Sequence, residues 1–369
     1  MKIGIVTLPL RLNYGGILQA YALQTALERM GHEVVVTDSP YRVSLPVWKW
    51  PYSYPKRVIR KYLLGKREWI FFEQYCNRAF PVISRYTQPF IDRYIHRLVV
   101  KDLSLLKEED FDAFVVGSDQ VWRPMYFPYP IERAYLDFAR NWEVRRIAYA
   151  VSFGTDCWEY TRKQTRRCGE LVKKFDAVGV REESGVRLCC EHLGVEAVHV
   201  LDPTLLLDVD DYKCLVESSG VPSGKGDLLC YILDETEEKW NLVSRLATDK
   251  GLTPFRGNSR VENLTAPLEQ RIQPPVEQWL RGFMDAKWVV TDSFHACVFS
   301  ILFHKPFTVL ANKERGLARI ESLLSMFGLE ERLCEGGVVV CEGDIDWEDV
   351  DERLEEWRKR SLDLCGKLW

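Results

Sequence analysis

The feature that most constrains the fold of this chain is a repeated unit. In each unit a short apolar run ends in polar residues and is followed by a helical pattern. Residues 288–303 show it, since the apolar run Trp288–Val290 leads into the polar run Thr291–His295, and a second apolar run ends at Phe303. Such a unit predicts a buried strand, a tight turn and a helix. Because strands that alternate with helices form parallel sheets, we expect an α/β fold.

The N-terminus begins with the same unit. The strand-like run Ile3–Thr7 is followed by a helical pattern from Ile17 to Met30, and then by a second strand around Val34–Val36. This order is a βαβ unit, which opens a parallel sheet. Further strands of the same sheet are predicted at 113–117, 147–152, 177–180 and 197–201.

A second series of units begins after the polar segment 218–226. A chain of 369 residues is also longer than one hydrophobic core usually supports. We therefore expect two Rossmann-like domains, 1–217 and 218–341, with a ligand cleft at the carboxyl ends of their strands. The acidic segment 342–369 is expected to form a helix that packs back across both domains. The predicted elements of the second domain are strands 228–233, 253–257, 288–291 and 307–310, and helices 237–250, 275–285, 296–303 and 317–327.

Residues 41–100 interrupt this rhythm and are interpreted as an insertion. They hold 12 Lys and Arg against 3 acidic residues, and 14 of the 60 are aromatic. Helices are predicted at 56–64 and 68–78. Two interpretations stay open. Either the segment folds as a subdomain that forms a binding groove, or its basic and aromatic surface docks on anionic lipid.

Composition excludes several classes of function. The net charge of −4 argues against nucleic-acid binding, and 11 cysteines without C-x-x-C spacing indicate a reduced, cytoplasmic protein. No apolar run approaches the ~18 residues of a membrane-spanning helix, so any attachment to the inner face of the membrane is expected to be peripheral. Because metal-ligand spacing, G-x-G-x-x-G and Walker motifs do not occur, neither a metal nor a nucleotide cofactor is expected.

The candidate site residues stand where the predicted strands end. His295 is the foremost, because it titrates near neutrality and suits acid or base chemistry. The Asp292–Ser293 pair before it can cap a helix, whose free N–H groups favour an anion. The alternative is a capped helix whose histidine fills a gap in the core. The other candidate substrate-binding residues at strand ends are Asn13, Tyr14, Gly15, Gly16, Ser118, Asp119, Gln120, Trp122 and Ser152.

Some of these residues have a second interpretation. Turns favour Gly, Ser, Asp and Asn for backbone reasons alone, so part of the set is expected to be structural. The Tyr14 and Trp122 rings are predicted to stack on a sugar, although a place in the core is the alternative for Trp122. Asp202 and Pro203 are interpreted as a strand terminator.

Three cations complete the candidate site. Arg181 directly follows the strand 177–180, so its side chain is expected to point toward the cleft and to bind phosphate or carboxylate. Lys313 and Arg315 precede a predicted helix, where an anion can bind. The alternatives are an ion pair of Arg181 with Glu182, Glu183 or a neighbouring helix, and a solvated charged face for the other two. If these cations converge near His295, the substrate is small, multiply anionic and held by both domains.

Taken in order, these segments resemble the polysaccharide pyruvyl transferase family. The resemblance covers about residues 1–330 and leaves out mainly the basic insertion and the C-terminal segment. It implies a fold similar to GT-B glycosyltransferases, with two Rossmann-like domains in a GT-B-like arrangement and a cleft between them. The matching segments are 3–5, 13–16, 116–122, 149–154, 180–182, 201–204 and 291–296.

The resemblance also implies a reaction. Members use phosphoenolpyruvate to place a pyruvate ketal on two hydroxyls of a sugar, so the expected acceptor is a polysaccharide or a lipid-linked glycan precursor. His295 matches the family's histidine, as general acid or phosphate ligand, Arg181 its first-domain arginine, and Lys313 the lysine after the next strand. No metal or redox cofactor is required. The chain departs from the family at Ser293, where better-known members often carry arginine. One cationic ligand of the donor is therefore missing, unless Arg315 or Arg319 takes its place.

Two other functions stay open from the sequence. One is a GT-B-type glycosyltransferase that uses a nucleotide sugar, because it would share the cleft, the anion site and a histidine. The other is a glycan-binding protein without catalytic activity. The sequence specifies neither the acceptor sugar and its hydroxyl pair nor the oligomeric state.

Overall fold

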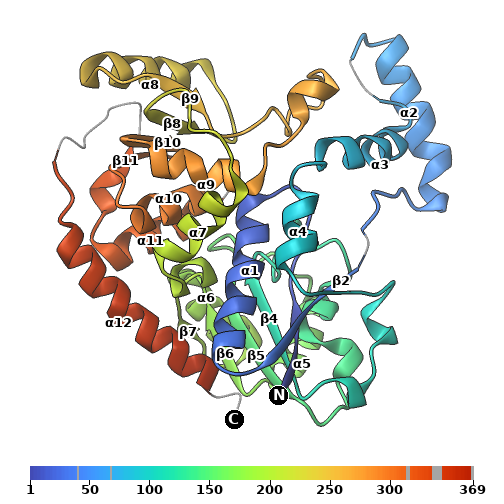
Figure 1. Ribbon diagram of the computed structural model, residues 1–369. Helices are drawn as coiled ribbons and strands as arrows, with labels where there is room; N and C mark the ends of the chain where they lie inside the picture. Colours follow the sequence, from blue (N-terminus) through green and yellow to red (C-terminus); the bar gives the residue numbers. More distant parts are fainter. Residues whose placement is uncertain (40, 67–68, 313–315, 335–342, 367–369) are drawn as a thin grey trace.

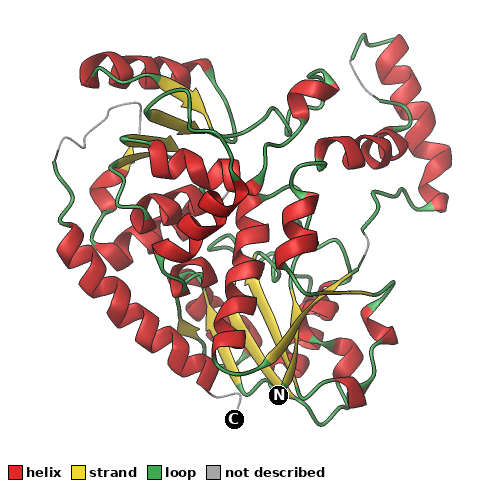
Figure 2. Cartoon of the chain, viewed as in Figure 1, coloured by secondary structure: helices red, strands yellow, loops and turns green. Residues whose placement is uncertain are grey.

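The computed structural model describes residues 1–39, 41–66, 69–312, 316–334 and 343–366. They form two parallel β-sheets, of seven and five strands, surrounded by helices (Figure 1). Figure 2 shows the same view with the strands in yellow between red helices. The α/β class predicted from the repeated strand–helix units is therefore confirmed, as is the division into two parallel sheets.

The first sheet has the strand order β3-β2-β1-β4-β5-β6-β7. Its central strands are buried along almost their whole length, as expected of a parallel sheet that is covered on both faces. Because neighbouring strands are parallel, their carboxyl ends meet at one edge. The strands are β1 (Lys2–Val6), β2 (Glu33–Asp38), β3 (Arg97–Val99), β4 (Ala113–Asp119), β5 (Arg145–Val151), β6 (Ala177–Val180) and β7 (Val198–His199).

The second sheet has the order β12-β11-β10-β8-β9. Its strands are β8 (Leu228–Tyr231), β9 (Pro254–Arg256), β10 (Trp288–Thr291), β11 (Phe307–Leu310) and β12 (Leu333–Cys334). Its helices are α8 (Glu237–Lys250), α9 (Val276–Asp285), α10 (Phe294–Leu302) and α11 (Leu317–Phe327). Every residue of α10 is buried, because this helix packs both on its own sheet and on the turn Pro203–Leu206 of the first domain.

Helices α1 (Tyr14–Arg29), α5 (Arg162–Val172) and α6 (Glu183–Leu188) belong to the first domain. Helix α1 begins after Asn13, whose Oδ1 accepts a hydrogen bond from the Gly15 N–H. Helices α5 and α6 follow β5 and β6. The N-terminus of α1 faces the second domain, since the Tyr14 hydroxyl donates to the Pro274 carbonyl at 2.8 Å.

The segment 41–100 is only in part an insertion. Its last part returns to the sheet as β3, which pairs with β2, and α4 (Gln88–Tyr94) places Phe90 and Ile91 in the core. The protruding part consists of α2 (Trp50–Tyr62) and α3 (Phe72–Ile83). Figure 1 shows α2 at the outer edge of the molecule and α3 leading back to its body. The prediction of one unbroken insertion was therefore too broad, because the sequence pattern does not reveal the buried face of α4.

Two helices connect the halves. Helix α7 (Val209–Ser219) precedes the polar segment yet packs against α9 of the second domain. Helix α12 (Trp347–Cys365) packs against α11 and then reaches the first domain, where the Ser361 Oγ accepts a hydrogen bond from the Leu201 N–H. The C-terminal helix thus crosses from one sheet to the other (Figure 1).

Candidate functional site

Two connected hollows lie where the strand ends of the two domains face each other. The inner chamber has a volume of about 110 Å³ and the outer groove one of about 550 Å³. Both are lined by Leu8, Asn13, Asp119, Tyr126, Leu233 and Ser293, which come from both domains. The inner chamber is completed by Gln120, Asp292, Phe294, His295, Asn312, Gly316, Arg319 and Ile320. The predicted cleft between the domains is therefore present.

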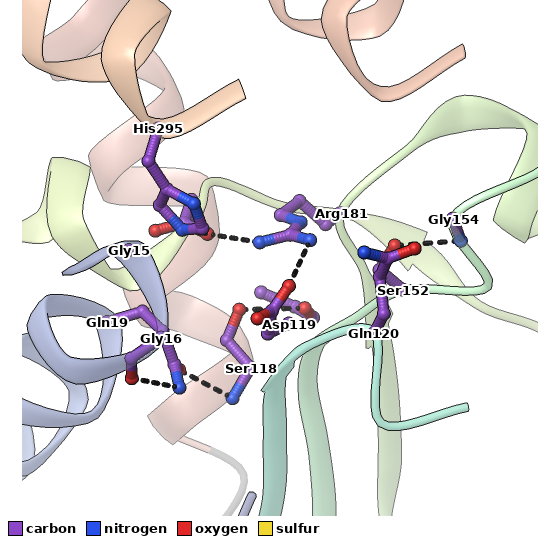
Figure 3. A network of polar contacts seen from close by, with 12 residues as sticks. Gly15, Gly16, Gln19, Ser118, Asp119, Gln120, Ser152, Gly154, Arg181 and His295 are labelled. Carbon is purple, nitrogen blue, oxygen red and sulfur yellow. Dashed lines mark hydrogen bonds and ion pairs between the residues drawn. The ribbon is translucent and has the colours of Figure 1, made fainter. Parts of the chain in front are cut away.

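Arg181 lies at the carboxyl end of β6, but its side chain is only 1% exposed. One of its terminal nitrogens, Nη2, donates to Asp119 Oδ1 at 3.0 Å, and Nη1 donates to Asp202 Oδ2 at 2.8 Å (Figure 3). Burial by itself would lower the pKa of this guanidinium, but the two carboxylates outweigh it and raise the pKa. The prediction of an arm that reaches into the cleft was therefore wrong. The alternative, an ion pair, holds with Asp119 and Asp202 as the partners.

His295 lies in the first turn of α10 and is 6% exposed. Its Nε2 lies 3.5 Å from Asp202 Oδ2, the same oxygen that accepts a hydrogen bond from Arg181. His295 also lines the inner chamber. His295 of the second domain and Arg181 of the first domain thus meet at the carboxylate of Asp202.

Asp202 is the functional candidate that sequence reasoning missed. It does end the strand region, since its Oδ1 accepts hydrogen bonds from the Thr204 N–H and hydroxyl at 3.0 and 2.7 Å. Its other oxygen faces Arg181 and His295. Burial alone would raise the pKa of Asp202, but His295, Arg181 and the Thr204 hydrogen bond outweigh it and hold the pKa well below its usual range. Its position at the same sheet edge as Arg181 was the available signal.

The absence of a side chain at Gly15 leaves room for the His295 ring. A Cβ atom on Gly15 would lie 2.0 Å from His295 Nδ1, so the backbone of α1 and the imidazole are in direct contact. Figure 3 shows the ring beside Gly15, with Arg181 on its other side. No side chain larger than hydrogen fits at this position unless the ring moves. Gly15 is therefore a packing residue for His295 and not a backbone ligand for the substrate.

Arg319 supplies a second buried guanidinium beside the inner chamber. Burial and the nearby Arg181 lower its pKa to about 10. Both guanidinium groups lie near the ring of Phe294, at 5.8 Å for Arg319 and 4.5 Å for Arg181. Of the two residues considered as substitutes for the missing family arginine, Arg319 thus lines the chamber. Lys313 and Arg315 lie outside the described residues, although their chain neighbours Asn312 and Gly316 line it.

Asp292 and Ser293 shape the wall of the second domain. Asp292 is buried and accepts hydrogen bonds from the backbone of Leu233 and Asp234, while the Lys239 Nζ binds its Oδ2 at 2.7 Å. Ser293 precedes α10 but its side chain makes no capping hydrogen bond. The predicted side-chain cap was therefore wrong, because Asp292 is occupied by the loop after β8 and Ser293 faces both hollows.

Two predicted ligands hold the strand ends of the first domain together. Ser118 is fully buried, and its hydroxyl donates to the Ala150 carbonyl. Ser152 is equally buried and donates to Glu182 Oε1, which also accepts from the backbone N–H groups of residues 153 and 154. Neither serine lines a hollow, so both are corrected to structural residues. Gln120 does line the inner chamber.

Gln19 was also missed by sequence reasoning. Its amide donates to Thr7 Oγ1 and the Gly16 carbonyl, and its Oε1 accepts from the Ser118 N–H at 2.9 Å (Figure 3). It thereby ties together the ends of β1 and β4 and the first turn of α1. A glutamine inside a helix carries no sequence signal for such a role.

Tyr14 and Trp122 are fully buried. The Tyr14 ring stacks on Trp279, and the Trp122 ring stacks on Tyr135 while its indole nitrogen donates to the Ala134 carbonyl. Neither ring is available to a sugar, so both predictions of stacking were wrong. The core alternative applies to Trp122, because large aromatic rings gain most from complete burial.

The outer groove has a wall of different chemistry. Helix α3 contributes Cys76, Ala79, Phe80 and Ile83, and the opposite sides carry Arg11, Arg271 and Gln273. The Arg11 guanidinium lies 4.1 Å from the centroid of the Phe80 ring, and Arg271 donates to the Tyr75 hydroxyl. The groove interpretation of the segment 41–100 is therefore supported for α3.

Two absences concern only the described part of the chain. Within it, no group of three or more His, Cys, Asp or Glu side chains could hold a metal ion. None of its helices is long and apolar enough to cross a membrane.

Comparisons with known proteins agree with the geometry. The family model described as polysaccharide pyruvyl transferase matches residues 13–314, whereas no curated protein matches the chain in sequence. Among solved structures, the chain is similar to UDP-GlcNAc 2-epimerase from Neisseria meningitidis, at 10% identity and a TM-score of 0.47, over 99% of this chain and 94% of that chain.

Two further solved structures are similar to the chain at low sequence identity. Arabidopsis thaliana UGT89C1 matches at 9% identity and a TM-score of 0.47, over 98% of this chain and 94% of that one. The E. coli heptosyltransferase WaaC matches at 13% identity and a TM-score of 0.38, over 97% of this chain and all of that one (100%). Identities this low say nothing of the substrate.

Proposed function

The chain belongs to the polysaccharide pyruvyl transferase family, and we propose that it transfers pyruvate from phosphoenolpyruvate to two hydroxyls of a sugar. The enzyme is accordingly a transferase. The acceptor sugar is part of a polysaccharide or of a lipid-linked glycan precursor. The observation that carries the proposal is the meeting of Arg181 and His295, from different domains, at Asp202 beside an enclosed chamber.

The inner chamber is assigned to the donor. Phosphoenolpyruvate is small and carries a phosphate and a carboxylate, so it needs cationic partners in a confined space. Arg319 and His295 line this chamber, while the charge of the buried Arg181 is already offset by Asp119 and Asp202. Lys313 and Arg315 stay predicted donor ligands, since they fall between the lining residues Asn312 and Gly316.

His295 then acts as the general acid. It delivers a proton to the methylene carbon of the donor, which leaves a cationic centre at the carbon that bears the phosphate. One sugar hydroxyl attacks this centre and loses its proton, and the second hydroxyl displaces phosphate to close the ketal ring. Asp202 Oδ2 lies 3.5 Å from His295 Nε2, so the carboxylate forms an ion pair with the imidazole when the ring is protonated. The reaction releases inorganic phosphate and needs no change of oxidation state.

The outer groove is assigned to the acceptor. It is five times larger than the inner chamber by volume, about 550 against 110 Å³, and shares its wall residues Asn13, Asp119 and Ser293. An acceptor in the groove therefore reaches the donor through a common opening. The Phe80 ring and the Arg11 and Arg271 side chains offer an apolar face and hydrogen-bond donors, which a sugar requires.

The test combines purified protein, phosphoenolpyruvate and a panel of glycan acceptors. The expected result is release of inorganic phosphate together with a mass gain of one pyruvate ketal on an acceptor. His295→Ala should lower the rate by at least about 100-fold, as loss of a general acid does. The matched control is His304→Ala, because His304 is an exposed histidine that pairs with Asp351 away from both hollows.

Two outcomes would contradict the proposal. If His295→Ala retains full turnover, the assigned acid is wrong. If nucleotide sugars, and not phosphoenolpyruvate, raise the melting temperature of the protein, the donor is wrong and a glycosyltransferase takes its place.

A further inference from the structure

Helix α2 carries an apolar face that points away from the molecule. Tyr52, Pro55, Ile59 and Tyr62 follow one another at spacings of three and four residues, so they share one side of the helix. None of the residues of α2 is buried. The α2 face is defined here as Trp48, Tyr52, Ile59, Tyr62 and Leu63, which are 70, 76, 49, 69 and 78% exposed. Large apolar side chains exposed side by side mark an interaction surface.

The charge around the α2 face is of one sign. Residues 47–66 hold six Lys and Arg and no acidic residue. Lys56 is exposed and lies one helical turn from both Tyr52 and Ile59, and Lys49, which directly precedes α2, is exposed and lies three residues before Tyr52. A cationic border around an aromatic and aliphatic face is the composition of helices that lie in the interface of a membrane. Trp and Tyr in particular occupy the level of the lipid head groups.

A basic recess lies between α2 and α3. It has a volume of about 320 Å³ and is lined by Ser53, Lys56, Arg57, Arg60, Trp69 and Phe72. Arg57 is held by Glu73 at 2.7 Å, which neutralises one of the three cations. The other basic side chains of the recess are Lys56 and Arg60, so the recess is lined by basic residues directly beside the apolar face.

The α2 face is connected to the site by α3. The far end of α3 supplies Phe80 and Ile83 to the wall of the outer groove. Figure 1 shows α2 projecting beyond the body of the molecule, with α3 between it and the two sheets. If α2 binds a surface, the outer groove therefore lies close to that surface, and the protein is held in one orientation relative to it.

We propose that the α2 face docks on a lipid bilayer that contains anionic head groups. Tyr52, Ile59 and Leu63 enter the interface, and Lys49 and Lys56 contact the head groups. Resting on the proposed function, this docking brings the groove to acceptor sugars that are anchored in the same bilayer by a lipid. The two interpretations of the segment 41–100 then both apply, to different helices.

The experiment is cosedimentation of the full chain with phosphatidylcholine vesicles and with vesicles that also contain phosphatidylglycerol. We expect binding to the anionic vesicles at low salt, weaker binding at high salt, and little binding to phosphatidylcholine alone. The double variant Tyr52→Ser/Ile59→Ser and the double variant Lys49→Glu/Lys56→Glu should each lower the bound fraction by about tenfold. The control is Leu105→Ser, since Leu105 is 64% exposed in the short helix Leu103–Leu105 and lies outside the α2 face.

Three results would overturn the docking proposal. They are no binding of the natural chain to anionic vesicles, unchanged binding of both double variants, and a dimer in solution that the Tyr52→Ser/Ile59→Ser variant converts to monomer. The last would make the α2 face an interface between two copies of the chain. Circular dichroism of each variant confirms that the fold is kept.

An activity measurement extends the test to the acceptor. The Tyr52→Ser/Ile59→Ser variant should turn over a short, soluble glycan as fast as the natural chain does, and a lipid-linked glycan in vesicles about tenfold more slowly. Equal rates with the vesicle-bound acceptor would contradict the role of docking. Absence of turnover with both acceptors would contradict the proposed function and leave the vesicle-binding result standing.

Discussion

The inner chamber and the outer groove are neighbours built on opposite principles. The inner chamber is surrounded by buried charges, among them Arg181, Asp119 and Asp202, which satisfy one another before any substrate arrives. The outer groove is wider and has a wall of apolar and aromatic side chains from α3. The difference teaches that the inner chamber, the proposed donor end of the site, is shaped by charges inside the fold. The outer groove, the proposed acceptor end, depends in part on the protruding helix α3.

The strongest test of this difference between the two hollows is a variant that lacks the Asp202 carboxylate. Asp202→Asn leaves Arg181 paired with Asp119 and removes the carboxylate beside His295 in a fully buried position, which costs about 3 kcal/mol of the free energy of unfolding. Chemical denaturation measures the loss. Turnover should fall as well, because the protonated His295 ring loses the carboxylate beside it.

The matched control is Asp210→Asn. The Asp210 side chain is 80% exposed and pairs with Lys213 on the surface of α7. Its removal should leave the free energy of unfolding close to that of the natural chain. If the Asp202 and Asp210 variants are equally stable, the buried charge cluster does not hold the inner chamber together.

The next largest effect is expected at the first turn of α1. Gly15→Ala would place a Cβ atom 2.0 Å from His295 Nδ1, so the imidazole must move. A displaced catalytic group costs about 100-fold in kcat, and steady-state kinetics measures it. Gly16→Ala is the adjacent control, since its Cβ would meet Asn13 Nδ2 at 3.5 Å, an ordinary contact. Equal kcat values for the two variants would show that the position of His295 does not matter.

A smaller effect is expected in the outer groove. Phe80→Ala removes the ring on which Arg11 packs and should raise the KM for the acceptor about fivefold, with the KM for phosphoenolpyruvate unchanged. Tyr86→Ala is the control, because Tyr86 is 45% exposed and packs with Arg85 outside the groove. A rise in the donor KM with Phe80→Ala would contradict the division of the site into two parts.

The smallest expected effect is one of pH. The folded pKa of Asp202 lies below the usual value of 3.8, so the native state binds fewer protons than the unfolded state at acidic pH. The stabilisation from Asp202 is therefore complete above about pH 4 and is lost as the pH falls toward the lowered folded pKa. Urea unfolding from neutral pH down to about pH 3 should show a shallower loss of stability for Asp202→Asn than for the natural chain. Parallel curves would contradict the lowered pKa.

Local patterns predicted many of the elements, but they missed β3, α4, α7 and β12, and the helices predicted at 56–64 and 68–78 are found at Trp50–Tyr62 and Phe72–Ile83. The strands Trp288–Thr291 and Phe307–Leu310 and the helices Glu237–Lys250 and Leu317–Phe327 have the predicted bounds, because their apolar spacing and end signals agree. Patterns failed for α4, whose sequence is rich in polar residues but whose Phe90 and Ile91 enter the core. Which side of a short helix is buried depends on the elements packed against it. The sequence of the seven-residue helix α4 therefore does not show that Phe90 and Ile91 enter the core.

The sequence predicted where the site lies, but not which of its side chains face the chamber and which are buried. His295, Asn13, Gln120 and Asp292 do line the inner chamber, since residues that follow parallel strands gather at one edge. Trp122 and Ser152 follow strands equally well and are buried instead. Whether a strand-end side chain faces the cleft or the core depends on the turn that follows, and the sequence does not show its direction.

By itself, the sequence determined the two parallel sheets, the order of their strand-end segments and the family to which the chain belongs. Each depends on short-range spacing or on residues matched in order. Only the tertiary structure decided that Asp202 joins Arg181 to His295, that Gly15 makes room for the imidazole, and that α2 and α3 face different surroundings. These are contacts between residues far apart in the chain, and only the packing of one domain against the other brings them together.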